Sequence, residues 1–194
     1  HHLDMVGVVG SNPIAPTRPI RAGPPGAPFL FLHRDRRRAM SRSPFDSILV
    51  VCTGNICRSP TAEALLRTRL AGLAMHPRIE SAGIGAVVGA GAHEHAVEVM
   101  RAWEIDLDDH VARQFEGSQD TAFELILVMK TGQKQWIERS SPQLSGRTWR
   151  LGHWLDEDIA DPMGHPVEDF RASRDHIDRA IDSWFDRLGL RPRA

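Results

Sequence analysis

Residues 50–60 read Val-Val-Cys-Thr-Gly-Asn-Ile-Cys-Arg-Ser-Pro, and this stretch decides the fold. Residues 48–51 are apolar and partly β-branched, which is typical of a buried parallel strand. Ser59 and Pro60 indicate the first turn of a helix, because Ser is favoured at helix N-termini and Pro lacks an N–H group that would be unpaired there. Glu63 is expected in the same turn, where its charge suits the positive end of the helix. A strand, a short loop and a helix are therefore predicted in direct succession.

The loop between this strand and this helix is predicted to bind a phosphate-like anion. Its backbone N–H groups converge at a helix N-terminus, where the helix dipole favours negative charge. Gly54 and Asn55 tolerate left-handed backbone, which allows successive N–H groups to face one centre. Arg58 can bind two oxygens of a phosphoryl group through its planar guanidinium. The other predicted phosphate-binding residues are Thr53, Gly54, Asn55, Ile56, Cys57 and Ser59.

Cys52 is the candidate nucleophile of the loop. A cysteine attacks as thiolate, and a thiolate needs positive potential, which the loop N–H groups, the helix dipole, the Ser59 hydroxyl and Arg58 would provide. The spacing from Cys52 to Arg58 is a weak signal alone, but the complete run at a strand-to-helix turn is specific. It is no Walker loop, since no Gly-Lys pair follows. The structural alternative is an inert buried thiol at the end of a strand.

Strand and helix signals alternate from residue 46 onward, which predicts an α/β fold with a four-stranded parallel sheet in a three-layer sandwich. Strands are expected at residues 48–51, 78–83, 124–129 and 148–151. Helices are expected at residues 61–72, 93–103, 131–139 and 167–188. Trp103 is expected to face inward from the second of these helices.

Three loops of this predicted sheet lie at its ligand-binding end. Ligands of open α/β sheets bind beyond the carboxyl ends of the strands. The loop after the first strand contains Cys52, the loop after the second contains Val87 and Val88, and the loop after the fourth contains Asp161. Pro162 biases Asp161 to extended backbone, so that its carboxyl can project from the loop. We expect these three loops to converge on one site.

The 194 residues, 41% of them hydrophobic, are enough for one domain. Residues 1–44 hold seven of the 13 prolines and a basic run at 33–38, and are expected to be a disordered extension outside the fold. The domain is then residues 45–194, with 17 basic and 23 acidic side chains. This balance argues against a nucleic-acid partner of the domain, although the basic run leaves open an arm that binds an anionic surface or a nucleic acid.

The chain has only two cysteines, Cys52 and Cys57, which fits a reducing, cytosolic setting. No run approaches the ~18 apolar residues of a membrane span, so membrane insertion is not expected. Two cysteines and nearby histidines could suggest zinc, but no second cysteine pair exists and Arg58 would oppose a cation. No metal is therefore expected, and the oligomeric state stays open.

The run at residues 50–60 resembles the phosphate loop of the low-molecular-weight protein tyrosine phosphatases, and the resemblance covers about residues 46–188. Residues 80–83, 110–114, 151–154 and 159–162 resemble the bacterial branch that works opposite tyrosine kinases of capsule or exopolysaccharide export. This resemblance implies a flavodoxin-like phosphatase fold and hydrolysis of phosphotyrosine without a cofactor. It also implies a phosphotyrosine protein as partner, in particular a bacterial tyrosine kinase, and a cytoplasmic location.

Catalytic roles follow from the same resemblance. Cys52 would attack the phosphorus and become a cysteinyl-phosphate, while Arg58 would stabilise the transition state. Asp161 would protonate the leaving phenolate and then activate water. These two steps would make the loop one half of a phosphatase site, with Asp161 in the other half.

Supporting residues are implied as well. Asn55 and His110 would hold the shape of the loop, and Ser59 would assist the thiolate. Tyrosine phosphatases commonly have an aromatic residue after the Asp-Pro pair, where this chain has Met163. Val87, Val88 and Met163 are therefore expected to form the substrate wall.

Other functions stay open beside this one. Protein arginine phosphatases have a small threonine at the position that Ile56 occupies in this chain. Ile56 favours a flat aromatic substrate. A non-catalytic phosphotyrosine-binding module would have no need of Asp161. Related arsenate reductases need further cysteines, which this chain lacks. Cys57 is either packed in the core or, as the resemblance implies, able to form a reversible disulfide with Cys52.

Overall fold

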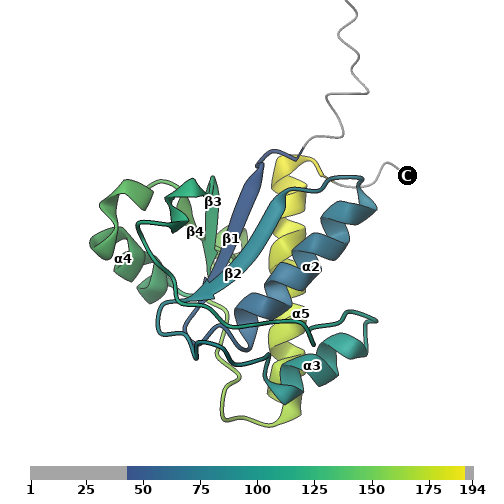
Figure 1. The fold of residues 1–194 in the computed structure, drawn as a ribbon. Helices are drawn as coiled ribbons and strands as arrows, with labels where there is room; N and C mark the ends of the chain where they lie inside the picture. Colours follow the sequence, from purple (N-terminus) through teal and green to yellow (C-terminus); the bar gives the residue numbers. More distant parts are fainter. Residues whose placement is uncertain (1–42, 191–194) are drawn as a thin grey trace, which may run out of the picture. The chain divides into compact units, whose positions relative to one another are not determined.

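The computed structural model describes residues 43–190 (Figure 1). The predicted extension at residues 1–44 lies outside the described residues, except for Ser43 and Pro44. Within the described part of the chain, no helix combines the length and the apolarity that crossing a membrane requires.

Four parallel strands form one sheet in the order β2-β1-β3-β4. They are β1 (Ser47–Cys52), β2 (Arg78–Gly83), β3 (Leu125–Val128) and β4 (Thr148–Arg150). The predicted four-stranded parallel sheet is thus confirmed. Strand β1 extends through Cys52, which pairs with Gly83 of β2, so the candidate nucleophile is the last residue of a central strand.

Helices cover both faces of the sheet and complete the predicted three-layer sandwich (Figure 1). They are α2 (Arg58–Gly72), α3 (Glu94–Arg101), α4 (Thr131–Ser140) and α5 (Val167–Leu188). Helices α2, α3 and α5 lie on one face, and α4 lies on the other.

The side chains of β1 alternate between two hydrophobic cores. Ile48, Val50 and Cys52 pack with the residues of α2 and α5, whereas Leu49 and Val51 pack on the side of α4. Because both faces of this strand are buried, its sequence is a continuous apolar run rather than an alternating one.

Helix α2 begins earlier than predicted. Its first residue is Arg58 rather than residue 61, and Cys57 is its N-cap. Ser59 and Pro60 lie in the first turn as predicted, but the prediction for Glu63 is wrong, because the earlier start moves this residue to the second turn. Glu63 pairs there with Arg67 at 2.7 Å instead of facing the helix N-terminus.

The prediction that Trp103 faces inward is also wrong. Helix α3 ends at Arg101, and the Trp103 side chain is 40% exposed. The guanidinium of Arg174, a buried residue of α5, lies 4.0 Å from the centre of the indole ring. A cation–π contact at the surface thus takes the place of core packing.

The loop after β1 lies at the point in the sheet where the order of the strands reverses. From β1 the chain crosses to β2 on one side and later to β3 on the other, which is the switch point where ligands of such sheets bind. The backbone N–H of Val87, in the loop after β2, donates to the carbonyl of Gly54 at 3.0 Å. The loops after β1 and β2 are therefore directly joined.

Gly83 ends β2 directly against the loop after β1. A Cβ at this position would lie 2.4 Å from the carbonyl oxygen of Thr53 and 3.0 Å from the backbone nitrogen of Asn55. We therefore expect Gly83→Ala to lower the free energy of unfolding by about 1–3 kcal/mol in urea denaturation, because the backbone of the loop must shift. Gly85→Ala is the matched control, since a Cβ there meets no atom within 4 Å. Equal unfolding midpoints for the two variants would contradict the tight contact.

Candidate active site

Cys52 lies at the base of a loop whose donors point at its sulfur. The side chain is buried, and its Sγ accepts a hydrogen bond from the backbone N–H of Asn55 at 3.2 Å. The Oγ of Ser59, in the first turn of α2, lies 3.0 Å from the same sulfur and can donate its hydrogen to it. N–H and O–H donors around a sulfur stabilise its anion, which is the nucleophilic form.

Asn55 holds the loop in shape from several sides. Its φ of 57° is in the left-handed region, and its side chain is fully buried. The side-chain amide donates to the hydroxyls of Ser59 and Ser81, both at 2.9 Å. The side-chain oxygen accepts from the backbone N–H of Arg113 at 2.8 Å, and the backbone carbonyl is 2.6 Å from Nε2 of His110. The structure therefore brings His110 to the loop.

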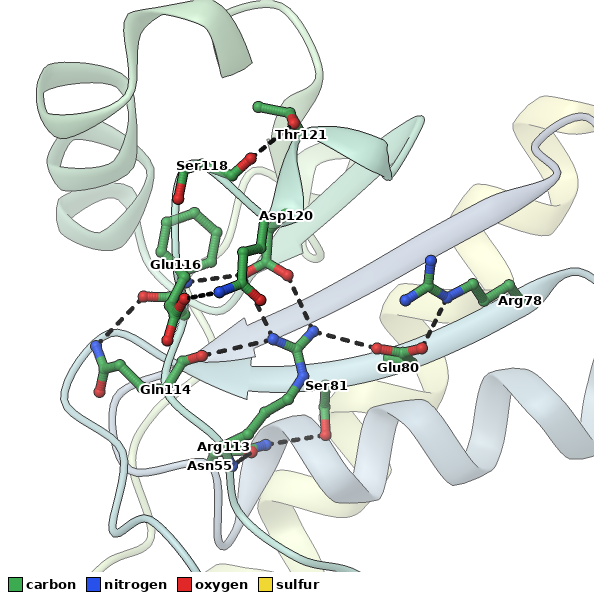
Figure 2. A network of polar contacts seen from close by, with 12 residues as sticks. Asn55, Arg78, Glu80, Ser81, Arg113, Gln114, Glu116, Ser118, Asp120 and Thr121 are labelled. Carbon is green, nitrogen blue, oxygen red and sulfur yellow. Dashed lines mark hydrogen bonds and ion pairs between the residues drawn. The ribbon is translucent and has the colours of Figure 1, made fainter.

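An ion-pair network extends from this anchor to β2 and beyond (Figure 2). The guanidinium of Arg113 pairs with Glu80 at 3.3 Å and with the buried carboxylate of Asp120 at 3.1 Å. Glu80 also pairs with Arg78 at 2.7 Å, and this hydrogen bond holds the pKa of Glu80 below its usual value. Sequence reasoning gave no role to Ser81 or Asp120, because contacts between distant segments leave no local pattern.

Arg58 and Asp161 meet although they are 103 positions apart in the sequence. Arg58 is only 2% exposed; its Nη1 donates to the carbonyl of Ile159 at 3.2 Å, and its Nη2 forms an ion pair with the Asp161 carboxylate. Its Nε is buried and has no hydrogen-bond partner within residues 43–190. Leaving a buried donor unpaired costs free energy, so this N–H group is suited to an oxygen of a bound anion.

The predicted substrate wall consists of exposed apolar side chains. Val87, Val88 and Met163 are all exposed, and Val87 is held against the loop by its hydrogen bond to Gly54. The backbone N–H of Met163 lies 3.4 Å from the Asp161 carboxylate, which places it in the turn that presents this side chain.

Gln133 is a loop contact that sequence reasoning missed. It lies in the first turn of α4, and its side-chain oxygen accepts from the backbone N–H groups of Met129 and Lys130. Its side-chain amide donates to the hydroxyl of Thr53 at 3.1 Å. A Gln three residues into a helix signals an N-terminal cap, but its link to Thr53 spans 80 residues and leaves no mark in the sequence.

Cys57 differs chemically from Cys52. Both are free, buried thiols. Burial, followed by the negative charges of Cys52 and Asp161, raises the pKa of Cys57 to about 12 against the opposing effect of Arg58. The Cys57 thiol is therefore neutral at physiological pH. It packs in the same hydrophobic core as Cys52.

Within residues 43–190, no group of three or more His, Cys, Asp or Glu side chains is placed to hold a metal ion.

Alkylation should separate the two cysteines. At pH 7, about one Cys57 thiol in 10⁵ is ionised if its pKa is about 12. We expect iodoacetamide to modify Cys52 and leave Cys57 unmodified, and inorganic phosphate to slow the reaction by occupying the loop. Mass spectrometry of the digested protein measures both sites. Equal modification of the two thiols in the folded protein would contradict the assignment.

Comparisons with known proteins agree with this geometry. A family model described as "Low molecular weight phosphotyrosine protein phosphatase" matches residues 47–192. The chain is 45% identical over 142 residues to the "Probable low molecular weight protein-tyrosine-phosphatase EpsP" of Ralstonia nicotianae, covering 73% of this chain and 95% of that protein.

Solved structures give the same result. The tyrosine phosphatase Wzb from Escherichia coli K30, in complex with sulphate, superposes with a TM-score of 0.70 at 39% identity, covering 75% of this chain and 99% of that chain. The YwlE arginine phosphatase from Geobacillus stearothermophilus has a TM-score of 0.68 at 34% identity, covering 76% and 94%. The resemblance seen in residues 50–60 is confirmed. The chain therefore belongs to the low molecular weight phosphotyrosine protein phosphatase family, in the bacterial branch of EpsP and Wzb.

Proposed function

We propose that Cys52, Arg58 and Asp161 hydrolyse protein phosphotyrosine through a cysteinyl-phosphate intermediate. The observation that supports this most directly is the position of the buried Arg58 side chain. It contacts the Asp161 carboxylate and keeps its Nε unpaired, at the start of the helix that follows the Cys52 loop. A module that only binds phosphotyrosine needs no proton donor, so the placement of Asp161 favours catalysis over binding.

In the first step, the Cys52 sulfur attacks phosphorus as the bond from phosphorus to the phenolic oxygen breaks. Arg58 and the loop N–H groups bind the non-bridging oxygens, whose charge dominates the loose transition state of phosphoryl transfer. Asp161, in its protonated form and released from the ion pair with Arg58, gives its proton to the departing phenolate. This transfer contributes ~10²–10⁴-fold in rate for a leaving group that is a strong base.

In the second step, water hydrolyses the cysteinyl-phosphate. The oxygen of the water attacks phosphorus, and the carboxylate of Asp161 accepts a proton from this water. The sulfur–phosphorus bond breaks, inorganic phosphate forms, and Cys52 leaves as thiolate. The N–H of Asn55 and the hydroxyl of Ser59 stabilise the departing thiolate, which restores the starting site.

Phosphotyrosine is the substrate that the wall of the site favours. Val87, Val88 and Met163 present exposed apolar surface, as a phenyl ring requires. Ile56 adds a bulky branched side chain to the loop, half-buried, with its carbonyl bound by the N–H of His93 at 2.8 Å. Protein arginine phosphatase activity is the alternative, because YwlE shares the fold.

The physiological partner is, on this proposal, a bacterial tyrosine kinase of polysaccharide export or one of its phosphorylated substrates. The support is the family branch, which the chain shares with EpsP and Wzb. We place the reaction in the cytoplasm, because the nucleophile must stay reduced and both cysteines are free thiols.

Substitution of the nucleophile and of the acid tests the mechanism. Cys52→Ser should lower turnover of para-nitrophenyl phosphate roughly 10⁴-fold or more, because a hydroxyl does not replace the thiolate. Asp161→Ala should lower the rate on aryl phosphates with strongly basic leaving groups by about 10²–10⁴-fold. Full turnover by Cys52→Ser would show that the proposed mechanism is wrong.

Matched phosphopeptides test the substrate. Wild-type protein should hydrolyse a phosphotyrosine peptide with a higher kcat/KM than a phosphoarginine peptide of the same sequence. Ile56→Thr should lower that ratio by roughly tenfold or more, since it removes apolar contact with the ring. Ile56→Val keeps a branched apolar side chain and is the control. A wild-type preference for phosphoarginine would support the alternative activity.

A further inference from the structure

The carboxylate of Asp158 binds the first turn of α4 from a distant loop. One of its oxygens is 3.0 Å from the backbone nitrogen of Thr131 and the other is 3.1 Å away. The Thr131 hydroxyl donates to the same carboxylate at 3.0 Å, and Nη1 of Arg150 donates at 3.0 Å. Four contacts from two elements therefore converge on one side chain, three residues before Asp161.

Helix α4 has no N-cap side chain of its own that could replace this carboxylate. Its N-cap residue is Lys130, whose ammonium has no acceptor atom and carries the sign of charge that a helix N-terminus disfavours. Asp158 supplies the acceptor and the negative charge from 27 residues further along the chain. The helix and the loop thus stabilise each other.

The charge of Asp158 is secure at neutral pH. Burial alone would raise the pKa of this carboxyl, but hydrogen bonds from Thr131 and Arg150 outweigh it and hold the pKa below its usual value.

Ile159, the residue after Asp158, connects these contacts to the active site. Ile159 is fully buried, and its backbone N–H donates to the carbonyl of Met129 at 2.9 Å. Its own carbonyl accepts from Arg58. After it, Asp161 and Met163 are partly or largely exposed. Residue 159 is therefore a fixed point of the loop two residues before Asp161, and Pro162, directly after Asp161, is buried as well.

We propose that Asp158 is a positioning residue for Asp161: its contacts with Thr131 and Arg150 fix the point from which the Asp161 carboxyl reaches the leaving-group oxygen. This inference rests on the proposed function. Proton transfer requires heavy atoms at hydrogen-bond distance, so a loop that starts from a shifted position transfers the proton more slowly. The bonds of Asp158 go to Thr131 and Arg150 and to no residue of the Cys52 loop, so its loss should affect the nucleophilic attack by Cys52 less than the proton transfer.

The predicted defect is specific to the leaving group. A phenolate, with a conjugate-acid pKa of ~10, departs slowly without a proton, whereas 2,4-dinitrophenolate is a weak base and departs unaided. Asp158→Asn keeps the shape of the side chain but removes its charge. We expect kcat/KM for phenyl phosphate to fall about tenfold, and that for 2,4-dinitrophenyl phosphate to change less than about twofold.

The chain offers a matched control in Asp156. This residue also pairs with Arg150, at 2.6 Å, but its side chain is 93% exposed and the structure gives it no bond to α4. Its φ of 54° is tolerated by Asn, so Asp156→Asn removes the same charge without backbone strain. Asp156→Asn should hydrolyse both esters at rates close to those of the wild type.

A double-mutant cycle separates positioning from general destabilisation. If Asp158 acts through Asp161, then Asp158→Asn should cause no further loss in an Asp161→Asn background. A loss that is equal for both esters, or that persists in the Asp161→Asn background, overturns the inference, as does wild-type behaviour of Asp158→Asn. If Asp158→Asn does not fold, Thr131→Val removes one donor to this carboxylate, the hydroxyl of Thr131. It should lower kcat/KM for phenyl phosphate about two- to threefold and leave that for 2,4-dinitrophenyl phosphate close to the wild-type value.

The failure of the proposed function gives a different result. If the proposed function is wrong, Asp161→Asn will not slow hydrolysis of phenyl phosphate more than that of 2,4-dinitrophenyl phosphate, relative to wild type. That comparison does not involve Asp158.

Discussion

The hydrogen bonds of Asn55 are the constraint on which the site depends. A loop that directs its N–H groups at one anion needs a left-handed backbone conformation, which most residues avoid. Asn55 adopts this conformation, with a φ of 57°. Its side chain compensates by bonding Ser59, Ser81 and the backbone of Arg113. Because these partners come from α2, β2 and the segment after α3, the shape of the loop is fixed by the fold as a whole.

The second half of the site depends on the order of the strands. Strand β3 lies between β1 and β4, so the loop after β4 reaches the loop after β1 at the same edge of the sheet. Arg58 closes the gap by contacting both Ile159 and Asp161. Helix α4 supports both loops, because Gln133 in its first turn binds Thr53 and Thr131 binds Asp158. The nucleophile and the proton donor thus share one rigid support.

Local sequence patterns predicted the helices and strands of the fold. They did not predict contacts between polar groups that lie far apart in the sequence. The strands and α5 are marked by apolar periodicity, and the loop at residues 52–58 by its complete motif. Glu63 was placed wrongly because the start signals at Ser59 and Pro60 fit several helix starts within one turn. Trp103 was placed wrongly because apolar periodicity takes no account of a cation such as Arg174 that covers an exposed ring. Asp158 lay in a polar loop with no sign of its partners, since these are set only by the folded chain.

The central claim is that Cys52 carries the phosphoryl group between the two steps, and a rapid-quench experiment tests it most directly. Wild-type protein mixed with an aryl phosphate and quenched in acid should yield a phosphorylated peptide that contains Cys52, formed and lost at rates consistent with turnover. The account predicts that mass spectrometry finds the phosphate on the Cys52 sulfur and that Cys52→Ser does not turn over the ester. Steady turnover with the phosphate on another residue, or with no phosphorylated protein formed at a competent rate, would contradict it.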